Sequence, residues 1–153
     1  MSSVPLTSDS SRPGATAGRS ERISYRKLLV AFLVAAVVAA AGSAVLFLIG
    51  SAVGLITPDV VLPTGAPMTV FEPIFSSVVG TVGATTALAI IARFTRRPIR
   101  IFRIVAAIVL VLSFTMPLGI AGAPLSYLAV VELMHVWVAG VAVTVLPALA
   151  RES

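Results

Sequence analysis

The sequence predicts an all-α fold: an antiparallel, up-down four-helix transmembrane bundle preceded by a disordered N-terminal tail. The composition, four long apolar runs and the placement of the basic residues predict it. Of 153 residues, 58% are hydrophobic and 11% are charged, whereas a soluble domain carries about 25% charged residues. With a mean hydropathy of +1.08, the chain lacks enough polar surface to cover an apolar core, so we expect the lipid bilayer as its partner.

Four apolar segments are the candidate membrane spans. A helix that crosses a bilayer needs about 20 mainly apolar residues. Runs of this kind occupy residues 28–56, 70–94, 101–120 and 125–149, and they belong to one transmembrane domain, residues 23–151. Because the connections are short, consecutive helices should be antiparallel neighbours.

The segment before the first span is polar. Residues 1–22 are rich in Ser, Thr, Gly and Pro, which predicts a disordered cytoplasmic tail. The apolar region of a signal peptide is only about 7–15 residues long. The first apolar run exceeds that length and follows a long polar tail, so we predict an uncleaved span.

The basic residues predict the orientation. All eleven Lys and Arg residues lie before the first span, after the fourth, or in the stretch from Arg93 to Arg103, which comprises the end of the second span, the connection and the start of the third. Cytoplasmic loops carry the excess of Lys and Arg, so we predict a multi-pass protein of the cell (cytoplasmic) membrane with both termini cytoplasmic. A net charge of +5 could also suggest nucleic acid, but the basic residues flank apolar runs and no polar domain carries them. We therefore expect no nucleic-acid partner.

Small residues at helical spacing indicate how the spans pack. Helices in lipid associate through close contacts of small residues and through polar contacts. The first span contains the GxxxG sequence of residues 50–54, and a second stripe there comprises Ala35, Ala39 and Ser43. The second span has a matching stripe: Ser76, Gly80, Gly83, Ala84 and Ala87. We predict that these stripes bring the first two spans together, and self-association or a membrane partner remains an alternative.

The stretch VVELMHVW, residues 130–137, places Glu132 and His135, the only histidine, inside the fourth apolar run. Residues three apart share a helix face. A charged side chain in the middle of a span costs about 2.5–3.5 kcal/mol by insertion measurements, so this face should point to protein or water. The pair could hydrogen-bond to each other or to Ser113 or Thr115, or it could form a proton or ligand site.

A metal site is a third interpretation of the same pair. Glu-x-x-His is the spacing of carboxylate-bridged metal sites in helix bundles, but those sites use two such motifs and further carboxylates. One histidine leaves too few ligands, so we predict no metal and no cofactor.

Glu72 begins the second span. The sequence TVFE, residues 69–72, fits a capping box, in which a Thr cap and a Glu three residues later satisfy free backbone N–H groups. Alternatively, an inward-pointing Glu72 at the mouth of the bundle could attract a cation or a proton.

Motifs of common enzymes are absent from the sequence. It has no phosphate-binding glycine loop, no HExxH and no serine nucleophile in a recognisable context. We therefore predict a non-enzymatic structural or accessory membrane component. The alternative is a small proton-coupled transporter or intramembrane ligand-binding protein that uses Glu132 and His135.

The second half of the chain resembles a family of small bacterial four-span membrane proteins known only as a domain of unknown function. The resemblance covers residues 96–151 and is carried by the runs RRPIRIFRIVAAIVLVLSF and LMHVWVAGVAVTVLPALAR. Its most specific elements are the Arg-rich loop, Ser113, the pair Met134–His135 and Pro147. The resemblance implies the four-span topology and gives no information about an activity. His135 belongs to the family pattern, whereas Glu132 does not clearly belong to it.

Overall fold

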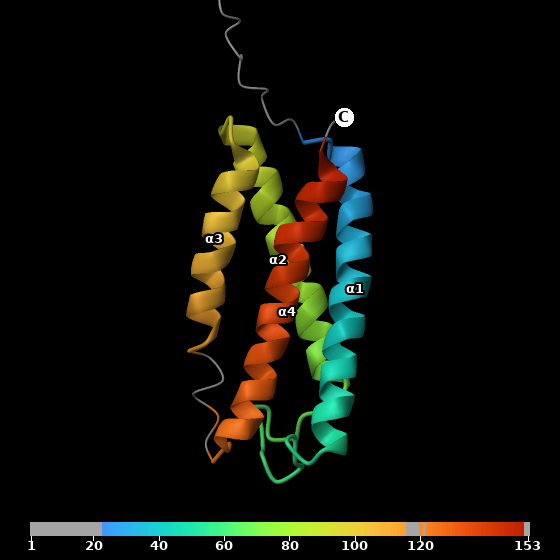
Figure 1. Cartoon of the computed structure of the whole chain (residues 1–153), viewed down its shortest axis with the longest axis vertical. Coiled ribbons are helices and arrows are strands. Elements are labelled where there is room, and N and C mark those ends of the chain that lie inside the picture. The colour runs from blue at the N-terminus through green and yellow to red at the C-terminus, as the bar shows by residue number, and fades with distance from the viewer. Residues whose placement is uncertain (1–22, 116–119, 121, 152–153) are drawn as a thin grey trace, which may run out of the picture.

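The computed structural model describes residues 23–115, 120 and 122–151. Within this part, the chain forms four helices and no strand (Figure 1), which confirms the all-α prediction. The helices lie side by side, and α1, α2 and α4 each run along most of the bundle, whereas α3 begins at the end where α2 finishes and stops partway along. The predicted tail, residues 1–22, lies outside the described residues. The helix bounds are α1 (Tyr25–Ala52), α2 (Phe71–Phe94), α3 (Pro98–Ser113) and α4 (Leu125–Ala150).

Three of these helices, α1, α2 and α4, are long and apolar enough to cross a membrane. The third predicted span differs from the structure, because α3 has 16 residues and ends at Ser113 instead of residue 120. Pro98 suits the first helical position, where its missing N–H costs nothing.

The first helix ends four residues before the predicted end of its span, at Ala52 instead of residue 56. Gly54 has φ +74°, a left-handed conformation that glycine adopts easily. The chain then folds back, so that the Ile56 N–H donates to the Gly50 carbonyl at 3.1 Å. The GxxxG prediction is therefore wrong, because Gly54 lies in a turn. Gly50 instead accommodates Ile56 and Val130, whose side-chain atoms would lie 3.1 Å from a Cβ at this position.

The interface between α1 and α2 confirms one predicted stripe and corrects the other. Ala35, Ala39 and Ser43 are buried on α1, as predicted. On α2 the buried positions include Ser77 and Thr81. The predicted stripe is only partly inward: Ser76, Gly80 and Gly83 are exposed, whereas Ala84 and Ala87 are partly buried.

A hydrogen bond explains why Ser77 is buried in place of Ser76. Ser77 Oγ lies 2.8 Å from Ser43 Oγ and 2.6 Å from the Pro73 carbonyl oxygen. Since a hydroxyl has one proton and a carbonyl can only accept, Ser77 donates to Pro73 and accepts from Ser43. This contact joins α1 to α2 in a fully buried position, where a hydroxyl needs a partner.

The first and fourth helices meet along the bundle. Where α1 begins and α4 ends, the Ser24 N–H donates to the Ala150 carbonyl at 3.0 Å. Further along, the Trp137 indole of α4 lies against Gly42, where a Cβ would come within 2.0 Å of Nε1. The same Nε1–H donates to the Val38 carbonyl at 3.4 Å. The close approach of Trp137 to α1 therefore requires a glycine at position 42.

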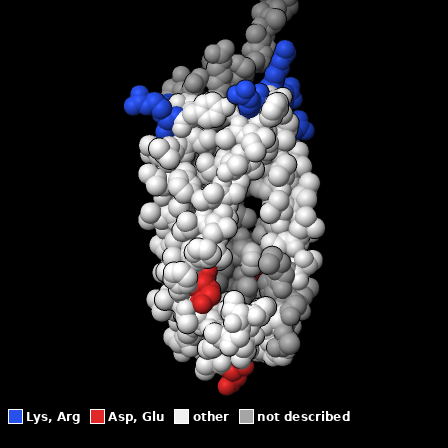
Figure 2. All heavy atoms as spheres, turned by 180° about the vertical axis from the view of Figure 1, so that it is seen from behind, with Lys and Arg blue, Asp and Glu red and all other residues white. Residues whose placement is uncertain are grey.

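The charged residues are separated along the bundle. Figure 2 shows Lys and Arg side chains around one end, while the acidic side chains visible on this face lie toward the other end. The basic end is formed by the start of α1, the end of α2, the start of α3 and the end of α4. The described basic residues are Arg26, Lys27, Arg93, Arg96, Arg97, Arg100, Arg103 and Arg151.

Candidate functional site

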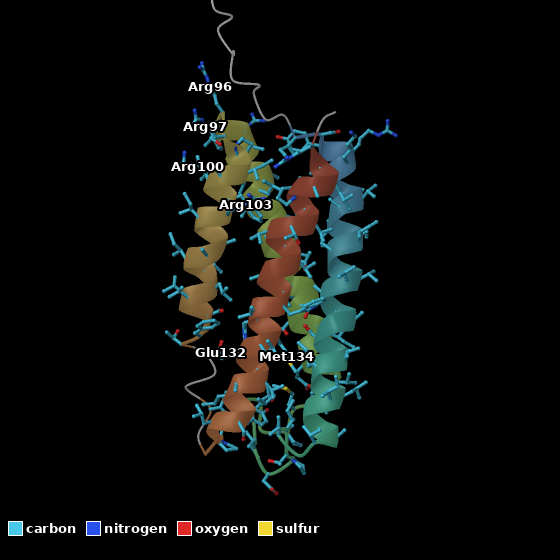
Figure 3. All side chains as sticks on the ribbon, in the orientation of Figure 1. Arg96, Arg97, Arg100, Arg103, Glu132 and Met134 are labelled. Carbon is cyan, nitrogen blue, oxygen red and sulfur yellow. The ribbon has the colours of Figure 1, made fainter. Side chains whose placement is uncertain are left out.

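Glu132 lies on α4 with its carboxylate inside the protein. Both carboxylate oxygens are buried, and neither accepts a hydrogen bond from the residues that the structure describes. Figure 3 shows Glu132 leaving α4 on the side that faces α3. A buried polar group without hydrogen-bond donors is costly, so Glu132 is the strongest candidate for a functional position among the described residues of α4.

His135 does not pair with Glu132. Its Nδ1 lies 2.9 Å from the Val131 carbonyl oxygen, one turn earlier on the same helix. Because a carbonyl can only accept, Nδ1 carries a proton and donates, and in the neutral ring Nε2 is then the acceptor. The imidazole is partly exposed, so it is held by its own helix and not by the neighbouring carboxylate.

The hydroxyl partners considered for this pair bond elsewhere. Ser113 Oγ donates to the Leu110 carbonyl at 2.7 Å, and Thr115 Oγ1 donates to the Leu112 carbonyl at 2.7 Å. Both hydroxyl protons therefore satisfy the last turn of α3. Neither hydroxyl donates to Glu132, so the predicted hydrogen bond from Ser113 or Thr115 to this pair is not formed.

Glu72 supports the start of α2. Its Oε2 accepts hydrogen bonds from the Thr69 N–H at 2.7 Å and from Thr69 Oγ1 at 2.5 Å. The Phe71 N–H in turn donates to Thr69 Oγ1 at 3.3 Å. The predicted hydrogen bond from the Thr69 N–H to the Glu72 carboxylate is confirmed. The Thr69 hydroxyl, however, accepts from the N–H of Phe71 and not from that of Glu72. The Glu72 carboxylate is therefore already engaged.

The three candidate residues do not assemble into a metal site. Across the described ranges, no group of three or more His, Cys, Asp or Glu side chains could hold a metal ion. Glu72 accepts hydrogen bonds from Thr69 just before α2, and His135 bonds to the Val131 carbonyl. Glu132 has no hydrogen-bond partner among the described residues. Glu132 is thus the one of the three whose charged atoms are buried without a described donor.

Sequence reasoning missed a second buried polar group. Tyr127 is fully buried, and its hydroxyl has no hydrogen-bond partner among the described residues. Its ring belongs to an apolar cluster at the non-basic end, together with Phe47, Ile56, Val131 and Met134. Figure 3 shows Met134 on the side of α4 away from Glu132. No motif marks Tyr127, because its burial depends on the loop after α1, which packs against the start of α4.

The fold and this site define a small four-helix protein with three helices capable of crossing a membrane and a buried carboxylate in one of them. The chain belongs to a family of unknown function, DUF6069, whose family model matches residues 23–153. The match extends the resemblance seen in residues 96–151 over the first two helices. No curated protein and no solved structure matches the chain.

Proposed function

We propose that this protein is a multi-pass integral protein of the cytoplasmic membrane that acts as a non-enzymatic structural or accessory component. The apolar surface of its helices carries this proposal. Large apolar side chains are exposed along α1, α2 and α4, including Leu33 at 55%, Phe75 at 57% and Leu133 at 51%. Apolar surface of this extent indicates a membrane or a partner, and the lengths of three helices favour the membrane.

In this proposal the chain crosses the bilayer four times. The first, second and fourth crossings are α1, α2 and α4. The third crossing is made with α3, which is about 24 Å long at 1.5 Å per residue. Ile120 supports this path, because it packs against the cluster around Tyr127 at the non-basic end. The basic end then faces the cytoplasm.

Fractionation tests the membrane assignment. We expect the protein in the membrane fraction, retained after alkaline carbonate washing and released only by detergent. A protein that stays soluble without detergent would contradict the proposal. The non-enzymatic assignment would fail if the purified protein turned over a substrate and His135→Ala abolished that turnover.

A second function is favoured by one observation, the unpartnered carboxylate of Glu132. In this alternative, Glu132 binds a proton or an organic cation inside the bundle, and the protein is a small proton-coupled transporter or ligand-binding protein. Intramembrane ionisable residues commonly mark such pathways. His135 lies three residues after Glu132 on the same helix, and its imidazole is partly exposed.

Flux measurements in proteoliposomes test this alternative. It predicts pH-dependent uptake of a lipophilic cation that disappears in Glu132→Gln and persists in the control Glu72→Gln, since Glu72 serves as a helix cap. Equal flux in wild type, Glu132→Gln and empty liposomes would end it and leave the structural role.

A further inference from the structure

A shallow groove lies between α1 and α2 near the basic end of the bundle. It is largely open at the surface and has a volume of about 320 Å³. We call it the α1–α2 groove. Its lining residues are Tyr25, Leu28, Leu29 and Phe32 from α1 and Val82, Thr85 and Thr86 from α2.

The lining of the α1–α2 groove is mainly apolar. Thr85 Oγ1 donates to the Thr81 carbonyl at 2.8 Å, and Thr86 Oγ1 donates to the Val82 carbonyl at 2.9 Å. Both hydroxyl protons are therefore used within α2, and the threonines contribute mainly methyl groups. Leu29 is 62% exposed at the groove wall. This surface suits an acyl chain better than a polar solute.

Two arginines continue the groove toward the basic end. Arg26 lies one turn before Leu29, and Arg93 lies seven residues after Thr86, so each shares a helix face with a lining residue. Arg93 is about 10 Å along the helix from Thr86 at 1.5 Å per residue. Both arginines are exposed. A guanidinium binds phosphate oxygens with two parallel hydrogen bonds.

We infer that the α1–α2 groove is a binding site for an anionic phospholipid of the cytoplasmic leaflet. One acyl chain lies in the groove, and the headgroup phosphate binds Arg26 and Arg93. The inference rests on the proposed membrane location. Charge complementarity selects the occupant, because a zwitterionic lipid adds its own cation beside the two guanidinium groups.

Native mass spectrometry of the detergent-purified full-length chain tests the inference. With phosphatidylglycerol and phosphatidylcholine added in equal amounts, we expect preferential retention of phosphatidylglycerol. A basic residue near an anionic lipid surface contributes about 1 kcal/mol, which is about fivefold in binding. Arg26→Gln and Arg93→Gln should each weaken phosphatidylglycerol binding by about that factor.

Two matched controls separate the groove from general charge. Arg100→Gln removes the same charge from α3 and should leave occupancy unchanged. Val82→Phe should fill the groove and lower occupancy without changing charge, whereas Val79→Phe, an exposed residue outside the lining, should not. Equal retention of both lipids, or equal losses in Arg93→Gln and Arg100→Gln, would overturn the inference. A protein absent from the membrane fraction would instead refute the proposed function.

Discussion

At the scale of single residues, the contact between Gly42 and Trp137 sets how closely α1 and α4 approach. The indole occupies the space that any side chain at position 42 would need. Trp137 also donates to the Val38 carbonyl, so moving the ring aside would break a hydrogen bond. The sequence offers a glycine and a tryptophan 95 positions apart with nothing to link them, so only the fold could identify this contact.

Gly42→Ala should destabilise the protein. Overpacking a filled site costs about 1–3 kcal/mol, and thermal unfolding in detergent would report it as a lower Tm. Gly83→Ala is the matched control, since nothing lies within 4 Å of a Cβ there. Alanine favours a helix over glycine by about 1 kcal/mol, so the control should be neutral or stabilising. Equal Tm values for both variants would contradict the packing described.

Glu132 gives a second prediction at this scale. Its oxygens have no described donor, so Glu132→Leu removes a buried polar group without leaving a described partner unpaired. Burying such a group costs about 1–3 kcal/mol by mutational data, and we expect the variant to unfold at a higher Tm. A clear loss of stability would show that Glu132 holds the bundle together through a hydrogen bond.

At the scale of helices, α3 is attached at one end. Pro98, Ile99 and Phe102 are its buried residues, and all lie in its first turns. Farther along, Ile108 is 55% exposed and Val111 is 65% exposed. The second half of α3 is therefore held by fewer protein contacts than the first.

Phe102→Ala should reveal this asymmetry. Phe102 is 1% exposed and belongs to the core cluster of α1, α2 and α4, and truncating a buried Phe costs about 3–5 kcal/mol. The exposed Ile108→Ala should change the unfolding free energy in detergent far less. Similar losses for the two variants, measured by chemical unfolding, would show that α3 packs along its whole length.

The elements also show what the sequence could predict. Apolar run length identified four helices, and the Glu arm of the cap at Glu72 was readable because capping is local. The sequence did not predict which face of α2 points inward. Ser76 and Ser77 are both small and polar, and which of them is buried depends on Ser43 of another helix. The GxxxG sequence failed for a similar reason, since it contains no signal that α1 ends before Gly54.

The candidate site was predictable only in part. The fourth apolar segment of the sequence placed Glu132 and His135 inside α4. Their hydrogen-bond partners, however, depend on neighbouring elements and on backbone geometry. His135 uses Nδ1 to bond to the Val131 carbonyl, and residue spacing alone does not predict that bond. The buried hydroxyl of Tyr127 could not be found either, because residues distant in sequence bury it.

At the scale of the whole molecule, the separation of charge along the bundle determines the proposed orientation. Basic residues surround one end (Figure 2), while the loop of residues 57–69 at the other end has Asp59 and no Lys or Arg. An excess of Lys and Arg marks the cytoplasmic side. The proposal therefore puts the Arg-rich turn between α2 and α3 in the cytoplasm and residues 57–69 outside.

Cysteine accessibility in intact cells tests this claim most directly. The chain has no cysteine, so Thr64→Cys and Arg96→Cys each introduce one reporter, at exposed positions on opposite ends of the bundle. We predict that a membrane-impermeant maleimide labels Thr64→Cys in intact cells and labels Arg96→Cys only after permeabilisation. Labelling of both in intact cells, or the reverse pattern, would contradict the proposed orientation.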